Sequence, residues 1–209
     1  MRNGWPEVGR LALSKSSLSI QSRQLRTFER FLPSLDLKRR QLIAEWAKAM
    51  LAIGETEREI ADLREQIERA MPMVSNQEVN VEGLVSVTEV EIDTENIVGV
   101  RLPRLENLHL HRSPYALLAK PAWVDRLAEC LAEMLRLKVR IQVERRRLVL
   151  LDEAVKTTTQ RVNLFDKVLI PRTRENIRQI RIFLADAERA AVVRAKIAKG
   201  KRAREAVAL

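Results

Sequence analysis

The sequence predicts an almost all-helical protein, in which the N- and C-terminal helices form a long antiparallel two-helix coiled coil and the middle segment holds a short β-hairpin. Three observations indicate this fold. Charged residues make up 32% of the 209 residues and aromatic residues only 4%, a composition that favours long exposed helices over a thick globular core. Glycine and proline are scarce, with six and seven residues. Apolar residues recur at heptad spacing in the first and last thirds of the chain, but not between them.

The first segment, residues 1–71, is expected to be a coiled-coil helix. One apolar stripe runs along it without an opposing apolar face, which is typical of a coiled-coil helix. The stripe is made of Leu18, Leu25, Leu32, Trp46, Ile53, Ile60 and Ile67 at one seam position and Phe28, Leu35, Leu42, Ala49, Leu63 and Ala70 at the other. Gln21, Arg39 and Thr56 interrupt the seam. Pro33 lies inside the pattern, and we expect a kink or break there because proline removes a backbone donor and clashes with the preceding turn.

The middle segment, residues 72–120, is expected to contain a β-hairpin at about 85–103. The helical period is lost after Met71, and β-branched residues flank the turn formers Asp93-Thr94-Glu95-Asn96. Pro103 is expected to end the second strand, because proline cannot donate to the ladder. An isolated two-stranded hairpin is marginally stable, so this one should pack on the helices or on a partner.

The last segment, residues 121–209, is expected to be a second coiled-coil helix with a basic tail. Its seam is formed by Leu127, Met134, Ile141, Leu148, Val155, Val162 and Leu169 with Cys130, Leu137, Leu151, Thr158 and Phe165. Glu144 interrupts this seam. Beyond Pro171 the stripe resumes one residue out of step, because Leu169 and Ile177 lie eight positions apart. We expect a local bend or a change of helical winding to absorb the slip.

The formal net charge of +10 is concentrated at the two ends of the chain. Antiparallel pairing of the two helices would place both basic ends at one tip. The residues expected there are Arg10, Lys15, Arg189, Arg194, Lys196, Lys199 and Lys201. We favour an acidic protein surface as the partner of this tip over nucleic-acid phosphates, because it lacks interleaved aromatic residues and its many alanines suggest a narrow, closely packed helix.

The sequence contains no recognisable catalytic constellation, and we expect no enzymatic activity of its own and no cofactor. The glycines do not form a phosphate-binding loop, and Gly200-Lys201 is not followed by the hydroxyl that such a loop needs. His109 and His111 could bind a metal, but without a second ligand cluster they are expected only to decorate a loop. The single cysteine, Cys130, is interpreted as a packing residue. With no bilayer-length apolar run and no signal-peptide stretch, a cytoplasmic location is expected.

Particular segments resemble the D-subunit family of V-type and A-type rotary ATPases. The most specific is 161–172, RVNLFDKVLIPR, followed by 96–103, NIVGVRLP, and 37–42, LKRRQL. The motif residues expected to contact other subunits are Asn96, Gly99, Val100, Pro103, Arg161, Asn163, Pro171 and Arg172. Two features depart from the family pattern: Pro33, where the family usually has an unbroken helix, and the many serines near the start.

The resemblance implies a non-catalytic rotor shaft, peripheral to the membrane, that couples ATP hydrolysis or synthesis to an ion-translocating ring. Its paired terminal helices would enter the hexamer of catalytic A and B subunits. The F subunit of the stalk would bind beside the shaft, and the lower end would sit in the socket subunit above the ring. No nucleotide or nucleic acid would bind directly. The alternative is a basic coiled-coil scaffold or a stalk protein of an export apparatus.

Overall fold

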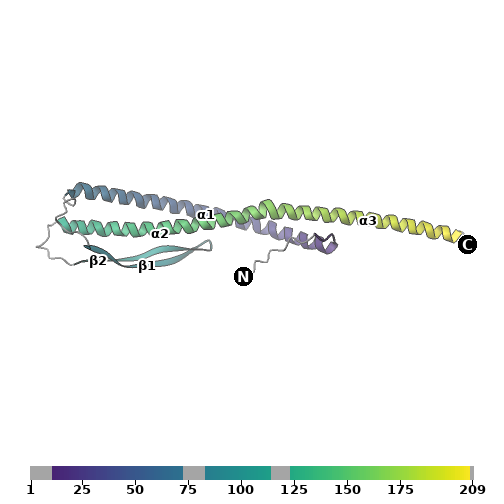
Figure 1. The fold of residues 1–209 in the computed structure, drawn as a ribbon, viewed down its shortest axis with the longest axis horizontal. Coiled ribbons are helices and arrows are strands. Elements are labelled where there is room, and N and C mark those ends of the chain that lie inside the picture. Colours follow the sequence, from purple (N-terminus) through teal and green to yellow (C-terminus); the bar gives the residue numbers. More distant parts are fainter. Residues whose placement is uncertain (1–10, 73–82, 114–122, 208–209) are drawn as a thin grey trace. The chain divides into compact units, whose positions relative to one another are not determined.

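A computed structural model describes residues 11–72, 83–113 and 123–207 (Figure 1). The elements follow one another as α1 (Lys15–Ala70), β1 (Val85–Ile97), β2 (Val100–Arg112), α2 (Trp123–Leu164), a π-helical turn η2 (Phe165–Leu169) and α3 (Ile170–Val207). The expected fold class is therefore confirmed: long terminal helices and a two-stranded antiparallel hairpin between them. None of the helices in these described ranges is long and apolar enough to cross a membrane.

The chain divides into two compact units. One is Lys38–Thr158, which contains the second half of α1, the hairpin and most of α2. The other combines Met1–Leu37 with Thr159–Leu209 and so contains the start of α1, η2 and α3.

Two buried clusters hold the Lys38–Thr158 unit together, and the hairpin lies alongside its helices (Figure 1). The first cluster joins α1, β2 and α2 through Leu42, Ala49, Leu102 and Leu151. The second joins the end of α1 and the start of β1 to α2 through Met71, Leu84, Val124 and Leu127. Because Leu102 of β2 is fully buried against both helices, the expectation that the hairpin packs on them is confirmed.

The hairpin turns later than the sequence predicted. The turn formers at 93–96 remain inside β1, and the chain reverses at Val98-Gly99, between the paired residues Ile97 and Val100. Val98 and Gly99 have φ of 53° and 79°, the two positive values of a type I′ turn, whose twist matches that of the flanking strands. A β-branched residue rarely adopts such a φ, and the packing of Val98 against the first cluster offsets the strain.

The second strand does not end at Pro103, as we expected, but continues to Arg112. Pro103 pairs with Thr94 inside the ladder. Both strands of a two-stranded sheet are edge strands, the positions in a sheet where proline is tolerated. The absent donor therefore does not stop the strand.

Of the kink or break expected at Pro33, the break does not occur: α1 is one continuous helix from Lys15 to Ala70. Pro33 is exposed, whereas its neighbours Leu32 and Leu35 are half-buried on the seam. Proline costs a helix interior about 3 kcal/mol, and the cooperativity and packing of a 56-residue helix offset a single cost of that size.

In the unit of the chain ends, a change of winding absorbs the slip in the C-terminal stripe, as predicted. Phe165–Leu169 form a π-helical turn, and the N–H of Ile170 donates to the carbonyl of Phe165, five residues back. This turn accommodates the one additional residue and places Ile177 and Ile180 in buried positions. The Phe165 ring meets Phe28 of α1 edge to face, with the ring centroids 5.4 Å apart.

Candidate functional site

A partly buried polar contact connects α1 and α2 in the Lys38–Thr158 unit. The two seam positions that interrupt the heptads, Thr56 and Glu144, meet there: the Thr56 hydroxyl donates to Glu144 Oε2 at 2.9 Å. Arg140 Nε donates to Glu144 Oε1 at 3.0 Å, and Arg140 Nη1 lies 3.5 Å from Glu59 Oε2. Both carboxylate oxygens of Glu144 are therefore occupied: Oε1 by Arg140 of the same helix, and Oε2 by Thr56, whose contact depends on how α1 is aligned along α2.

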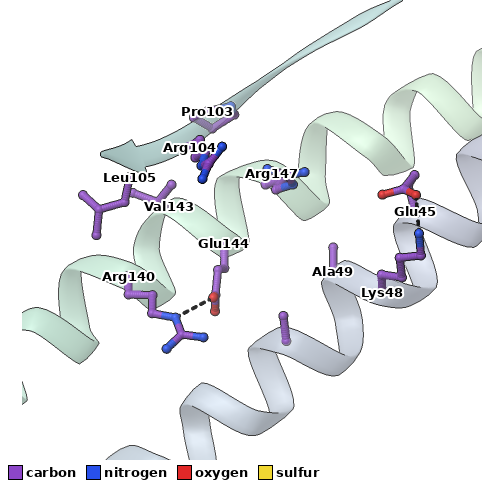
Figure 2. Close-up of a pocket in the computed structure, with 11 residues that line it drawn as sticks. Glu45, Lys48, Ala49, Pro103, Arg104, Leu105, Arg140, Val143, Glu144 and Arg147 are labelled. Carbon is purple, nitrogen blue, oxygen red and sulfur yellow. Dashed lines mark hydrogen bonds and ion pairs between the residues drawn. The ribbon is translucent and has the colours of Figure 1, made fainter. Parts of the chain in front are cut away.

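Beside this contact lies a pocket of about 440 Å³ between α1, α2 and β2 (Figure 2). Figure 2 shows Arg104 reaching from β2 toward α2, which contributes Arg140, Glu144 and Arg147. Arg147 is paired with Glu95 of β1 at 3.0 Å. The lining consists of aliphatic side chains and largely ion-paired charges, which suits contact with another polar surface.

The hairpin tip rests against α1. An ideal Cβ on Gly99 would lie 3.3 Å from Lys38 Nζ, so the backbone approaches that side chain closely. Of the other motif residues predicted here, Asn96 is exposed and faces Arg101 across the ladder. Val100 packs on the first buried cluster, and Pro103 lines the pocket of Figure 2. Asn96 thus lies near the end of β1, Gly99 in the turn, and Val100 and Pro103 in the first part of β2; of these four residues, Pro103 lines the pocket.

The second set of motif residues surrounds the π turn. Arg161 and Asn163 precede it, and Pro171 and Arg172 follow it, all with exposed side chains. Next to Arg172, the buried hydroxyl of Thr173 donates to the Leu169 carbonyl, four residues back, at 2.6 Å. The motif therefore combines an irregular turn with four side chains that face solvent.

The residues of the predicted basic tip lie in the unit of the chain ends. Lys15 Nζ, at the start of α1, lies 3.6 Å from Glu188 Oε1 of α3, and Arg189 pairs with Asp186 at 3.4 Å. Beyond Arg189, α3 continues with exposed side chains at Arg194, Lys196, Lys199 and Lys201. Arg10 lies outside the described residues.

With this geometry established, comparison with known proteins decides the family. The family model that describes the D subunit of ATP synthase matches residues 17–200, from the first turns of α1 to the last part of α3. The chain belongs to the ATP synthase D-subunit family. The resemblance recognised in the sequence is therefore confirmed, and the match includes every motif residue named above.

Curated members of the D-subunit family match along most of their length. The V-type ATP synthase D subunit of Borreliella burgdorferi is 34% identical over 192 residues, covering 92% of this chain and 95% of the relative. The proteins of the same name from Chlamydia pneumoniae and Chlamydia muridarum are 31% and 33% identical. They cover 90% and 91% of this chain, and 91% and 95% of those relatives.

Two groups of side chains in this member of the D-subunit family were missed by the sequence analysis. His109 was considered together with His111, but the strand register sets it opposite Glu89 and near Glu91, and the ligand atoms of these three residues lie within 4.8 Å of one another. Only the register brings them together. The second group comprises Arg174, Arg178 and Arg181, whose spacing of four and three residues places them on one helix face. That spacing, visible in the sequence, could have indicated that the three arginines share one face.

Proposed function

We propose that this protein is the non-catalytic central-stalk rotor subunit of a V-type or A-type rotary ATPase. It transmits torque between the catalytic A/B hexamer and the membrane ion-translocating ring. The observation that carries the proposal is the D-subunit family match over residues 17–200, which covers both long helices and the hairpin. The lengths of α1, with 56 residues, and of α2, with 42, suit a shaft better than an enzyme domain.

Torque transfer requires resistance to twisting and an asymmetric surface. In the Lys38–Thr158 unit, the Thr56–Glu144 contact opposes sliding of α1 along α2. Arg145 of α2 also forms an ion pair between the helices, with Glu57 of α1 at 2.9 Å. The hairpin makes this unit asymmetric, because it is held to the helices by Leu102 and by the Arg147–Glu95 pair. These features support a mechanical role that needs no covalent chemistry.

The proposed partners follow from this role. The exposed basic residues of α3 suit the acidic or carbonyl-rich loops of the catalytic A and B subunits, which would surround the shaft. The F subunit would bind beside the shaft, and the socket subunit above the membrane ring would receive its other end. The protein would therefore work on the cytoplasmic side, peripheral to the membrane.

Affinity purification from the native cells tests this proposal. The tagged chain is recovered at moderate salt, and its partners are identified by mass. We expect stoichiometric A, B and F subunits together with ATPase activity. Recovery of nucleic acid, or of an export apparatus without those subunits, would contradict the rotor function and leave a coiled-coil scaffold as the better interpretation.

A further inference from the structure

Arginines from two helices line one groove in the unit of the chain ends. α3 contributes Arg174, Arg178 and Arg181, and α1 contributes Arg26 and Ser22, around a volume of about 540 Å³. An adjoining pocket of about 400 Å³ shares Ser22 and Arg26 and adds further basic side chains of α1. We call the first of these volumes the arginine groove.

The positive charge of the arginine groove is only partly neutralised within the chain. Arg174 pairs with Glu29 at 2.8 Å, and Arg178 lies 3.9 Å from Glu175. Neither Arg26 nor Arg181 has an ion-pair partner among the described residues. Clustered guanidinium groups repel one another, so a nearby anion would stabilise them, and carboxylates and phosphates both fit the planar fork of arginine.

The floor of the groove favours a carboxylate-bearing peptide over a free phosphate. Leu25, Ile177 and Ile182 also line it. Ile177 is buried, but Ile182 is 54% exposed and leaves apolar surface open beside the arginines. An inorganic anion makes no use of such a surface, whereas an acidic loop that also carries an aliphatic side chain covers it.

We propose that the arginine groove binds a carboxylate-rich loop of a neighbouring subunit, with an aliphatic side chain of that loop against Ile182. This inference rests on the proposed rotor function and extends it, because it assigns the contact to residues outside the predicted basic tip. Each exposed ion pair contributes modestly and is screened by salt. The contact would therefore be stronger at low salt than at high salt.

Zero-length cross-linking in the assembled complex tests the contact directly. Arg26→Lys, Arg178→Lys and Arg181→Lys keep the charge but supply amines that a carbodiimide joins to a carboxylate in contact. The matched control is Arg58→Lys, Arg136→Lys and Arg146→Lys, three exposed arginines of the other unit. We expect the groove lysines to couple to Asp or Glu within one segment of a neighbouring subunit, and the control lysines not to couple to that segment.

A charge-neutralising variant gives a second measurement. Replacing Arg26, Arg178 and Arg181 with Gln should weaken retention of the hexamer subunits roughly tenfold at low salt and far less at high salt. The same replacement at Arg58, Arg136 and Arg146 should leave retention unchanged. Unchanged helical circular dichroism confirms that both variants fold.

The outcomes separate this inference from the proposed function. Recovery of A, B and F subunits with no cross-link from the groove lysines, or equal coupling by the control lysines, overturns the inference and leaves the rotor function standing. Binding of tripolyphosphate by the full chain that is lost in the Gln variant, without any peptide cross-link, assigns the groove to a free anion and also overturns it. Absence of the subunits from the purified material overturns both proposals.

Discussion

At the scale of single residues, two glycines differ in whether their backbone conformation allows a larger residue. Gly99 closes the hairpin at φ 79° and lies close to Lys38, whereas Gly54 occupies the interior of α1, where an added Cβ would meet nothing within 4 Å. The same substitution should therefore have opposite effects at the two positions.

Gly99→Ala should lower the free energy of unfolding by about 1–2 kcal/mol, because an L side chain is strained at this φ. Gly54→Ala, the matched control, should raise it by up to about 1 kcal/mol, because alanine favours the helix. Urea denaturation followed by helical circular dichroism measures both. Destabilisation by both substitutions to the same extent would show that the tip conformation is not what constrains Gly99.

At the scale of elements, two irregularities in the heptad pattern have structural counterparts. The polar seam residues Thr56 and Glu144 form one contact between α1 and α2, and the π turn, which ends at Leu169, absorbs the one-residue slip of the C-terminal stripe. The sequence alone located both irregularities. It did not indicate that Thr56 and Glu144 would meet, because that depends on the alignment of helices separated by 88 positions in the chain.

Thr56→Val should destabilise the protein by about 1–2 kcal/mol, because the partly buried Glu144 carboxylate then loses a hydrogen-bond donor. Glu144→Leu should also destabilise it, since the Thr56 hydroxyl loses its acceptor. The double variant should be more stable than the two single effects predict, because it makes the seam apolar on both sides. Urea midpoints of the four proteins give the coupling, and strictly additive effects would contradict a direct contact.

Deleting Val168 from the π turn should convert Phe165–Leu169 into α-helix with little loss of stability. Val168 is 47% exposed, and its removal leaves the buried residues Val162, Ile170 and Ile177 at seven-residue spacing. Deleting Gln179, an exposed residue within regular α3, should instead lower the Tm by about 10 °C or more, because it rotates the following stripe off its partner. A large loss from the Val168 deletion would show that the π turn itself is needed for folding.

At the scale of the whole molecule, burial is unevenly distributed. The Lys38–Thr158 unit contains both buried clusters, whereas the described side chains of α3 from Ala185 onward are all exposed. A solvent-exposed helical segment with few packing contacts opens at a low free energy. This difference predicts where the chain should depend most on its partners.

Hydrogen exchange of the isolated chain should therefore be slow in residues 42–63 and fast in residues 189–201. Assembly with the A and B subunits should slow exchange in residues 189–201, if the basic side chains there contact the hexamer. Mass spectrometry of peptides from the two preparations makes the comparison. Equal exchange of this segment in both would place the hexamer contact elsewhere.

The sequence by itself determined the helical class, the two heptad seams, the slip near Pro171, the presence of a hairpin and the family. Periodicity and turn chemistry are local properties, so they can be read along the chain. The tertiary structure decided the turn at Val98-Gly99, the continuation of β2 beyond Pro103, the Thr56–Glu144 contact and the arginine groove. Each of these depends on which distant residues face one another, and strand register and helix packing fix that only in the folded chain.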